Sequence, residues 1–310
     1  MDPNSTEIVY EFPHFLRLYK DGRIERTILT TIPPGTDPNT GVESKDIIIL
    51  PEKCISARLF RPKITNPTQK LILLIYIHGG AFCIGSPFDL VYHKHLTTLT
   101  AQANIVALSV NYRLAPENPL PIAYEDTWTA IQWVASHVNG NGPETWLNDH
   151  VDFGRVFFAG DSAGGNLAHN MAMQATIDGL DGLKLEGILL IHPYFGNNKP
   201  DNANRLVKYL YPNGFDGPRI NVAKDPNLSC LGCSRVVIFV AENDPVKDRG
   251  IIYYEALKNS DWSGVVELVE TKNEDHVFHL IHKETGNIDV QNKQKAVALV
   301  NKMVSFMTQD

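Results

Sequence analysis

Two glycine-rich loops, each directly behind a short apolar run, constrain the fold of this chain most strongly. The first loop, 78–81, reads HGGA and follows the apolar run 71–77; the second, 160–164, reads GDSAG and follows 156–159. The pattern G-x-S-x-G places a serine on a tight turn from a strand into a helix, where its hydroxyl is exposed. An HGG sequence after a strand has the form of a loop whose backbone N–H groups bind an oxyanion. Together, in this order, the two loops predict a serine hydrolase.

Apolar runs alternate with helical patterns from residue 71 onward, which predicts an α/β fold. Continuous apolar strands joined by helices are typical of a mostly parallel central sheet with helices on both faces. Active sites of such sheets lie beyond the carboxyl ends of the strands, where both glycine loops fall. We expect an antiparallel pair at 46–50 and 55–60, strands at 71–77, 104–110, 155–159, 185–191, 235–241 and 265–270, and helices at 93–103, 124–138, 162–177, 249–259 and about 290–307.

The domain organisation predicted for the 310 residues is a single domain over 1–310, because no repeat or dividing linker interrupts them. Two polar, turn-rich segments stand apart from the regular pattern. We expect 1–40 to form a flexible arm or a small cap over the site. We expect 196–229, which lies between two strands, to be an insertion over the same site.

Composition restricts the partners and the compartment. The net charge of −7 argues against a nucleic-acid or anionic-membrane surface, so no such partner is expected. The first 15 residues lack the apolar core of a secretory signal, and the run 71–77 is too short to span a bilayer, so a cytoplasmic location is expected. Cys230 and Cys233 have redox or zinc spacing without a second ligand pair, so we expect packing, and neither a metal nor a cofactor.

The base that would activate Ser162 is predicted to be His276. A serine hydroxyl needs a base and an orienting acid, and in this fold the chain order is Ser, then acid, then His. His276, His279 and His282 follow the strand 265–270, and His276 comes first, on the loop where a base must lie. A metal face at 276, 279 and 282 is the alternative, but it needs a helix that begins earlier than the loop allows.

The orienting acid is predicted to be Asp244. The candidates after strand 235–241 are Glu242, Asp244 and Asp248. Asp244 precedes Pro245 and therefore lies in a turn, whereas Asp248 is typical of a helix start, where an acidic side chain complements the helix dipole. Glu242 is the alternative.

The oxyanion donors are predicted to be the backbone N–H groups of Gly79, Gly80 and Ala163. Glycine at 79 and 80 lets the backbone approach a ligand without a Cβ in the way, and the helix that begins near Ser162 adds a positive dipole end. We expect His78 to buttress its own loop. Cys83 either lines the acyl pocket or packs.

Several motifs resemble the hormone-sensitive-lipase-like branch of α/β-hydrolases and, within it, the plant carboxylesterases. The resemblance runs from about residue 15 to the end of the chain. The matching segments are YKDGRIER at 19–26, TGVESKD at 40–46, HGGAFC at 78–83, YRLAPE at 112–117, LPIAYED at 120–126, GDSAGG at 160–165, DPVKDRG at 244–250 and EDHVFH at 274–279.

The resemblance implies a carboxylesterase that hydrolyses a small ester of plant specialised metabolism. The chain is also similar to 2-hydroxyisoflavanone dehydratases, some of which carry Thr where this chain has Ser162, so elimination on the same residues is the alternative. Gibberellin receptors share the fold but lack the triad histidine, which is present here as His276. A non-catalytic small-molecule receptor is therefore a further alternative. The segment 196–229 is shorter than the resemblance leads us to expect.

Overall fold

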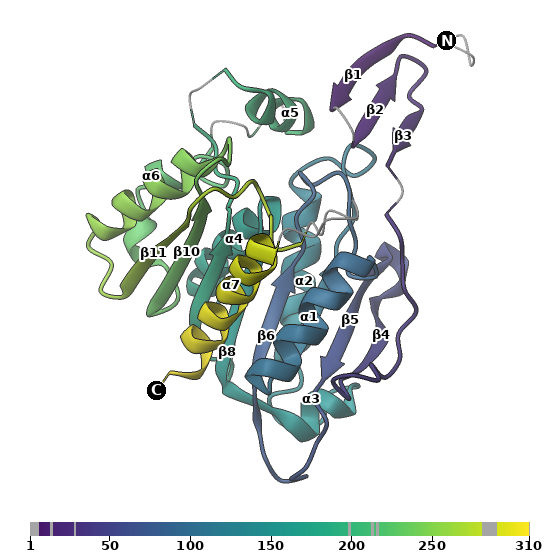
Figure 1. Cartoon of the computed structure of the whole chain (residues 1–310), viewed down its shortest axis with the longest axis vertical. Coiled ribbons are helices and arrows are strands. Elements are labelled where there is room, and N and C mark those ends of the chain that lie inside the picture. Colours follow the sequence, from purple (N-terminus) through teal and green to yellow (C-terminus); the bar gives the residue numbers. More distant parts are fainter. Residues whose placement is uncertain are drawn as a thin grey trace.

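A central β-sheet organises the molecule (Figure 1). The structure is a computed structural model and describes residues 6–12, 15–27, 29–197, 200–211, 214, 217–280 and 290–309. Within these residues, eight strands pair in the order β11-β10-β9-β8-β6-β7-β5-β4. The strands are β4 (Glu43–Leu50), β5 (Ile55–Arg61), β6 (Leu71–Ile77), β7 (Val106–Asn111), β8 (Val151–Asp161), β9 (Leu185–Ile191), β10 (Arg235–Ala241) and β11 (Val265–Thr271).

Most of this sheet is parallel. Pairing is parallel from β7 through β6, β8, β9 and β10 to β11. β5 pairs antiparallel with both β7 and β4. The predicted fold class and the antiparallel start are therefore confirmed. The predicted strands 71–77, 185–191 and 235–241 coincide with β6, β9 and β10.

Helices cover both faces, because successive side chains of each buried strand point to opposite faces. Leu73 and Ile75 of β6 belong to one apolar core, and Leu74 and Tyr76 to the other. The first core is covered by α2 (Ile122–Ala135), α4 (Ala163–Asp178), α6 (Lys247–Lys258) and the short α3 (Thr145–His150). The second is covered by α1 (Leu90–Ala103) and α7 (Val290–Thr308), which lie in front of the sheet in Figure 1. In the part of the chain that the structure describes, no helix has the length and apolarity needed to cross a membrane.

Six parallel strands end at the same edge of the sheet, which we call the carboxyl edge. The loops that follow β6, β7, β8, β9, β10 and β11 begin at residues 78, 112, 162, 192, 242 and 272. Parallel pairing brings these six loops together although they are spread over nearly two hundred residues. This edge is where the sequence places the site.

A small cap covers the carboxyl edge. It consists of a three-stranded antiparallel sheet with β1 (Ile8–Phe12), β2 (Leu16–Tyr19) and β3 (Ile24–Arg26), together with α5 (Asn202–Leu210). Figure 1 shows the small sheet and α5 beyond the end of β6. The two parts join in one apolar cluster, and the rings of Tyr10 and Tyr209 stack with centroids 5.4 Å apart. The sequence predicted an arm or cap at 1–40 and an insertion at 196–229, but not these strands or this helix.

Two arginines anchor the cap to the rest of the molecule. The buried Arg249 of α6 donates to the Phe195 carbonyl at 2.8 Å and pairs with Asp201, at the start of α5, at 2.5 Å. Arg26 of β3 donates from Nε to the Cys83 carbonyl at 2.7 Å. Each half of the cap is therefore fixed by a guanidinium group, which can satisfy several acceptors at once.

Candidate active site

Ser162 occupies a strained turn between β8 and α4. Its φ of 51° and ψ of −116° lie outside the regions that non-glycine residues favour. Gly164 permits this turn, because a Cβ at that position would lie 2.0 Å from the Ile77 carbonyl oxygen. Ser162 is only partly buried, and it immediately precedes the first turn of α4. The hydroxyl is thus held at the carboxyl edge, as the G-x-S-x-G pattern predicts.

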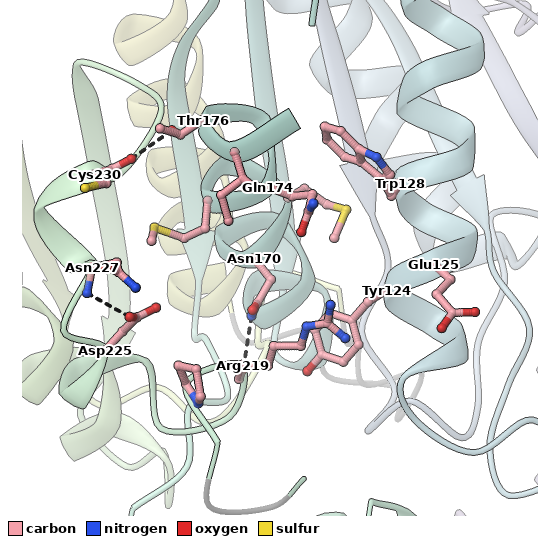
Figure 2. Close-up of a pocket in the computed structure, with 14 residues that line it drawn as sticks. Tyr124, Glu125, Trp128, Asn170, Gln174, Thr176, Arg219, Asp225, Asn227 and Cys230 are labelled. Carbon is pink, nitrogen blue, oxygen red and sulfur yellow. Dashed lines mark hydrogen bonds between the residues drawn. The ribbon is translucent and has the colours of Figure 1, made fainter. Parts of the chain in front are cut away.

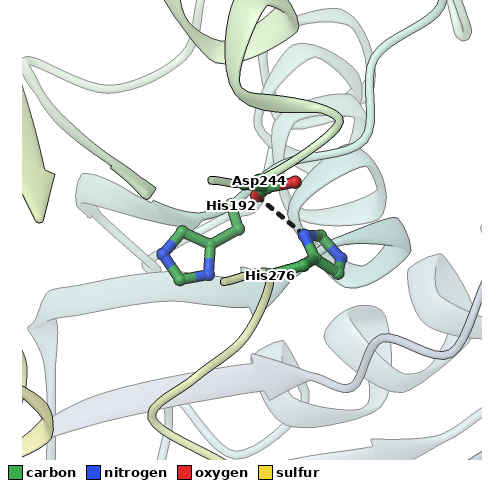
Figure 3. A group of neighbouring side chains, drawn as sticks. All are labelled: His192, Asp244 and His276. Atoms are coloured by element: carbon green, nitrogen blue, oxygen red, sulfur yellow. Dashed lines mark hydrogen bonds and ion pairs between the residues drawn. The ribbon is translucent and has the colours of Figure 1, made fainter. Parts of the chain in front are cut away.

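Ser162, His276 and Asp244 form a continuous hydrogen-bonded relay. His276 Nε2 lies 2.9 Å from Ser162 Oγ, and His276 Nδ1 lies 2.8 Å from Asp244 Oδ2. Figure 3 shows the second of these contacts. The three residues follow β8, β11 and β10, so the parallel sheet assembles them from positions up to 114 residues apart. The structure therefore brings together the three residues that the sequence proposed as a triad.

Asp244 is the acid in contact with His276, and the other two candidates, Glu242 and Asp248, lie outside this contact. The Asp244 side chain is completely buried, and its Oδ1 accepts a hydrogen bond from the Val246 N–H at 2.8 Å. Glu242 accepts from the Asn273 N–H at 2.9 Å, outside the relay. Asp248 is exposed in the first turn of α6. With Oδ1 fixed by the backbone, Oδ2 remains for the imidazole.

The loop 78–81, which we call the oxyanion loop, differs from the prediction at one residue. The Gly79 N–H donates to Asp161 Oδ1 at 3.1 Å and to the Tyr92 hydroxyl at 3.0 Å, so it points into the protein. The prediction that Gly79 supplies an oxyanion donor is therefore wrong. A Cβ at Gly79 would lie 2.3 Å from Asp161 Oδ2, so glycine is needed there for close packing against Asp161.

Three other backbone N–H groups are available near Ser162. Among the described residues, none accepts a hydrogen bond from the N–H of Gly80, Ala81 or Ala163. Gly80 and Ala81 both have positive φ values, 97° and 54°, so the chain reverses its direction directly after Gly79. Gly80 and Ala163 stay candidates for the oxyanion donors, and Ala81 takes the place of Gly79.

Comparison with known proteins decides the family. The model of a family described as having the alpha/beta hydrolase fold matches residues 74–280, about two thirds of the chain. This chain is an α/β-hydrolase. It is 46% identical to "Probable carboxylesterase 5" of Arabidopsis thaliana, over 97% of this chain and 99% of that protein. It is 43% identical to "2-hydroxyisoflavanone dehydratase" of Glycyrrhiza echinata, over 91% of this chain and 93% of that protein.

Solved structures agree with the family. The Pyrobaculum calidifontis esterase is 27% identical with a TM-score of 0.66, and the match covers 85% of each chain. The thermophilic carboxylesterase EstE1, from a metagenomic library, is 25% identical with a TM-score of 0.67, and the match covers 86% of this chain and 90% of that chain. The resemblance to plant carboxylesterases and to dehydratase-like relatives is thus confirmed.

His192 is a neighbour of the relay in this hydrolase that the sequence argument did not single out. Its ring centroid lies 5.9 Å from that of His276, and its Nδ1 accepts a hydrogen bond from the Val277 N–H at 2.9 Å. Burial, and then the charge of His276, lowers the pKa of His192 to about 3, so it is neutral at pH 7. It therefore fixes the backbone beside His276. Its position directly after β9 was the signal that could have identified it.

His192, Asp244 and His276 also have the composition of a metal site (Figure 3). Their ligand atoms all lie within 4.8 Å of one another. Both Asp244 oxygens, however, already accept hydrogen bonds, as does Nδ1 of His192. The cluster is accounted for by the relay and its support. The alternative metal face at 276, 279 and 282 includes His279, which is buried against His192, and His282, which lies outside the described residues.

His78 and Cys83 both have structural environments. His78 is fully buried, stacks on Tyr112 with ring centroids 4.3 Å apart, and donates from Nδ1 to the Gly79 carbonyl at 2.8 Å. Burial lowers the pKa of His78 to about 4. The prediction that it buttresses its own loop is confirmed. Cys83 packs in the cap cluster, and burial raises the pKa of its thiol to about 12, so it is no nucleophile.

A cleft with a volume of about 660 Å³ lies away from the relay (Figure 2). It runs between α2, α4 and the segment 218–230, and its wall includes Trp128, Asn170 and Arg219. Its α4 residues begin at Asn170, two turns beyond Ser162, and no member of the triad lines it. The candidate active site is therefore identified by the relay and not by the size of this cleft.

Proposed function

We propose that this α/β-hydrolase is a serine carboxylesterase that acts through an acyl-enzyme. The observation that carries the proposal is the relay from Ser162 Oγ through His276 to the buried Asp244, at 2.9 and 2.8 Å. Such an arrangement converts a weakly nucleophilic hydroxyl into an attacking group. The carboxylesterases among the relatives and solved structures support the same reaction.

The acylation step uses groups of this chain. Ser162 Oγ attacks the ester carbonyl carbon and transfers its proton to His276 Nε2, while the carbonyl electron pair moves to the oxygen. The N–H groups of Gly80, Ala81 and Ala163, at the positive end of α4, stabilise that oxyanion. When the carbonyl re-forms, the bond to the alcohol breaks and His276 protonates the departing alkoxide. Asp244 holds Nδ1–H and stabilises the imidazolium.

Deacylation repeats these steps with water. His276 takes a proton from a water molecule whose oxygen attacks the acyl carbon. Collapse of the second tetrahedral intermediate releases the carboxylic acid, and His276 returns its proton to Ser162 Oγ. Because one imidazole acts as base and then as acid in both halves, the position of His276 between Ser162 and Asp244 is central to the reaction.

We propose a small, largely apolar ester as the substrate. Support comes from the cap cluster, in which the cap residues Leu16, Leu18 and Leu206 pack on Cys83 and Ile84, directly after the oxyanion loop. The net charge of −7 disfavours anionic ligands. The plant origin of the relatives supports an ester of plant specialised metabolism.

The test is Ser162→Ala. We expect hydrolysis of p-nitrophenyl acetate to fall about 10⁴-fold or more, because the nucleophile is lost, and covalent labelling by a fluorophosphonate to disappear. Ser136→Ala is the matched control, since Ser136 is an exposed serine outside the site and should leave both signals unchanged. Hydrolysis at the wild-type rate by the Ser162→Ala variant would exclude the proposal.

Elimination is the second candidate, favoured by the relative named 2-hydroxyisoflavanone dehydratase at 43% identity. In that reaction His276 would remove a proton next to a carbonyl, and the same N–H groups would stabilise the enolate. The two functions differ in their need for an acyl-enzyme. Dehydration of a 2-hydroxyisoflavanone that survives Ser162→Ala, while ester hydrolysis is lost, would establish the second activity.

A further inference from the structure

Asp161, the neighbour of the nucleophile, is a buried carboxylate that the ester-hydrolysis mechanism does not use. It ends β8 and is 1% exposed. Its Oδ1 accepts hydrogen bonds from the Tyr76 hydroxyl at 2.9 Å and the Gly79 N–H at 3.1 Å, and its Oδ2 accepts from the Tyr92 hydroxyl at 3.1 Å. Strand β6, helix α1 and the oxyanion loop therefore converge on one carboxylate.

This charge is unfavourable in two respects. Burial raises the pKa of Asp161 to about 6, although the hydrogen bonds from Tyr76 and Tyr92 oppose that rise. A negative charge beside Ser162 also opposes the oxyanion that the reaction forms, because like charges repel strongly in a buried site. Asp161 therefore does not aid formation of the oxyanion through its charge, and what it can provide to the oxyanion donors is geometry.

The geometry concerns the direction of the oxyanion loop. With its N–H bonded to Asp161, Gly79 faces the interior, and the three positive-φ residues that follow, Gly80, Ala81 and Phe82, reverse the chain. On the other side of the loop, the Tyr112 hydroxyl donates to the His78 carbonyl at 2.9 Å. Gly79 is thus the fixed point from which the next two N–H groups take their directions.

We propose that Asp161 is the positioning residue of the oxyanion loop. Its carboxylate holds the Gly79 N–H inward and thereby directs the N–H groups of Gly80 and Ala81 toward the carbonyl oxygen of an ester bound at Ser162. This inference rests on the proposed esterase function and assigns a role to a residue outside the triad.

The experiment measures kcat and KM for p-nitrophenyl acetate together with the affinity for a short-chain alkyl trifluoromethyl ketone. Ser162 adds to that ketone to give a hemiketal oxyanion, so its affinity reports the oxyanion donors directly. The variants are Asp161→Ala, Asp161→Asn and Tyr92→Phe. Tyr124→Phe is the matched control, since Tyr124 is a buried tyrosine whose hydroxyl donates to Asn166 at 2.8 Å rather than to the oxyanion loop, while its ring, which packs on Phe82, is kept.

We expect Asp161→Ala to lower kcat about 100-fold, the effect of one misplaced oxyanion donor, with KM within about threefold. Ketone affinity should fall by the same factor as kcat/KM. Asp161→Asn keeps an acceptor for the Gly79 N–H and should recover most of the loss. Because it also removes a buried charge, its melting temperature should equal or exceed that of the wild type. Tyr92→Phe should lower kcat severalfold, and Tyr124→Phe should not change it.

Two outcomes would overturn the inference. One is a kcat within about threefold of wild type for both Asp161→Ala and Tyr92→Phe, against the hundredfold that a lost donor costs. The other is a fall in kcat with unchanged ketone affinity. Should Asp161→Ala fail to fold, Tyr92→Phe and Asp161→Asn carry the test. The proposed function is judged separately, by whether the wild-type chain hydrolyses the ester and loses that activity with Ser162→Ala.

Discussion

The carboxyl edge and the cap hold their side chains in place in different ways. At the edge, Ser162 and Asp244 follow the largely buried strands β8 and β10, and His276 follows the edge strand β11, which is paired to β10 along its whole length. In the cap, β1 and β3 are short and half-exposed, and a few contacts such as Arg26 with the Cys83 carbonyl hold them. The difference indicates that the sheet fixes the reaction, whereas the cap can vary in sequence and shape what fits above it.

The largest expected effect lies at the carboxyl edge. We expect Asp244→Asn to lower kcat about 10³-fold or more at pH 7, because the amide no longer holds the Nδ1–H tautomer of His276. Glu242→Gln, two residues earlier on the same loop, should change kcat less than about twofold, since Glu242 contacts Asn273 and Lys272 instead. Steady-state kinetics on p-nitrophenyl acetate measure both. If both substitutions lowered kcat by the same factor, the assignment of Asp244 rather than Glu242 as the orienting acid would be contradicted.

The same leucine truncation in the two regions should give different results. Leu189→Ala, in the buried β9, is expected to cost about 2–5 kcal/mol of unfolding free energy. Leu206→Ala, in α5, should cost less globally, because the cap cluster can open locally. It should instead change KM more for a bulky acyl ester than for an acetate. Urea unfolding measures the stability of both variants, and kinetics on the two esters measure KM. A larger loss of unfolding free energy for Leu206→Ala than for Leu189→Ala would contradict the expected difference between the two regions.

Stability should fall as the pH drops from about 6.5 toward 4, and buried histidines in the loops of the carboxyl edge and in the helices α1 and α4 should carry this dependence. Burial lowers the pKa of His78 and His95 to about 4 and of His169 and His192 to about 3. The unfolded chain binds these protons near pH 6.5, before the folded chain does, so acid favours unfolding.

Asp161, with its raised pKa of about 6, acts in the opposite direction, since the folded chain takes up its proton first, but it is outnumbered by these histidines. Melting temperatures between pH 5 and pH 7 check the sign. His169→Gln should reduce the slope, because the buried His169 bonds to the Tyr253 hydroxyl at 3.0 Å and packs on Phe195, and it takes no part in the relay. A flat profile for the wild type would contradict the expectation.

The smallest expected effect tests the link between the regions. Arg26→Gln removes the ion pair with Glu117 and weakens the hydrogen bonds to the Cys83 and Ala115 carbonyls. We expect kcat/KM to fall about tenfold, because the two hydrogen bonds to the Cys83 and Ala115 carbonyls are no longer charge-assisted. Arg17→Gln on β2 is the matched control, since its partner Glu11 is exposed and the pair should contribute little. If Arg26→Gln and Arg17→Gln had the same kcat/KM, the cap and the oxyanion loop would not be coupled.

The sequence predicted the regions where one physical signal dominates. The apolar runs 71–77, 185–191 and 235–241 could be assigned as strands because both of their faces are buried. The candidates Ser162, Asp244 and His276 were then identified from the loops behind the predicted strands 155–159, 235–241 and 265–270. The strands of the cap and the nine residues of α5 were not predicted, because they are short and lie in polar, turn-rich segments where no continuous apolar run marks them.

Gly79 shows a different limit of the sequence. Its place in an HGG loop is compatible with either direction of its N–H group. The direction depends on Asp161 and Tyr92, which lie 82 and 13 residues away along the chain. A local pattern could indicate that the backbone approaches something closely there, but only the fold shows that the partner is a carboxylate in the interior.

The spread of the triad over three loops has a consequence for how the chain acquires activity. Ser162 and His276 are 114 residues apart, and β11, which precedes His276, is the edge strand of the sheet. Contacts of such long sequence separation form late, because closing the intervening chain costs entropy. During refolding, the interior around β6 and β8 can therefore become ordered while the protein is still inactive. Recovered ester hydrolysis would then mark the docking of the last strand. The rate at which activity returns during refolding would therefore report the final step of assembly.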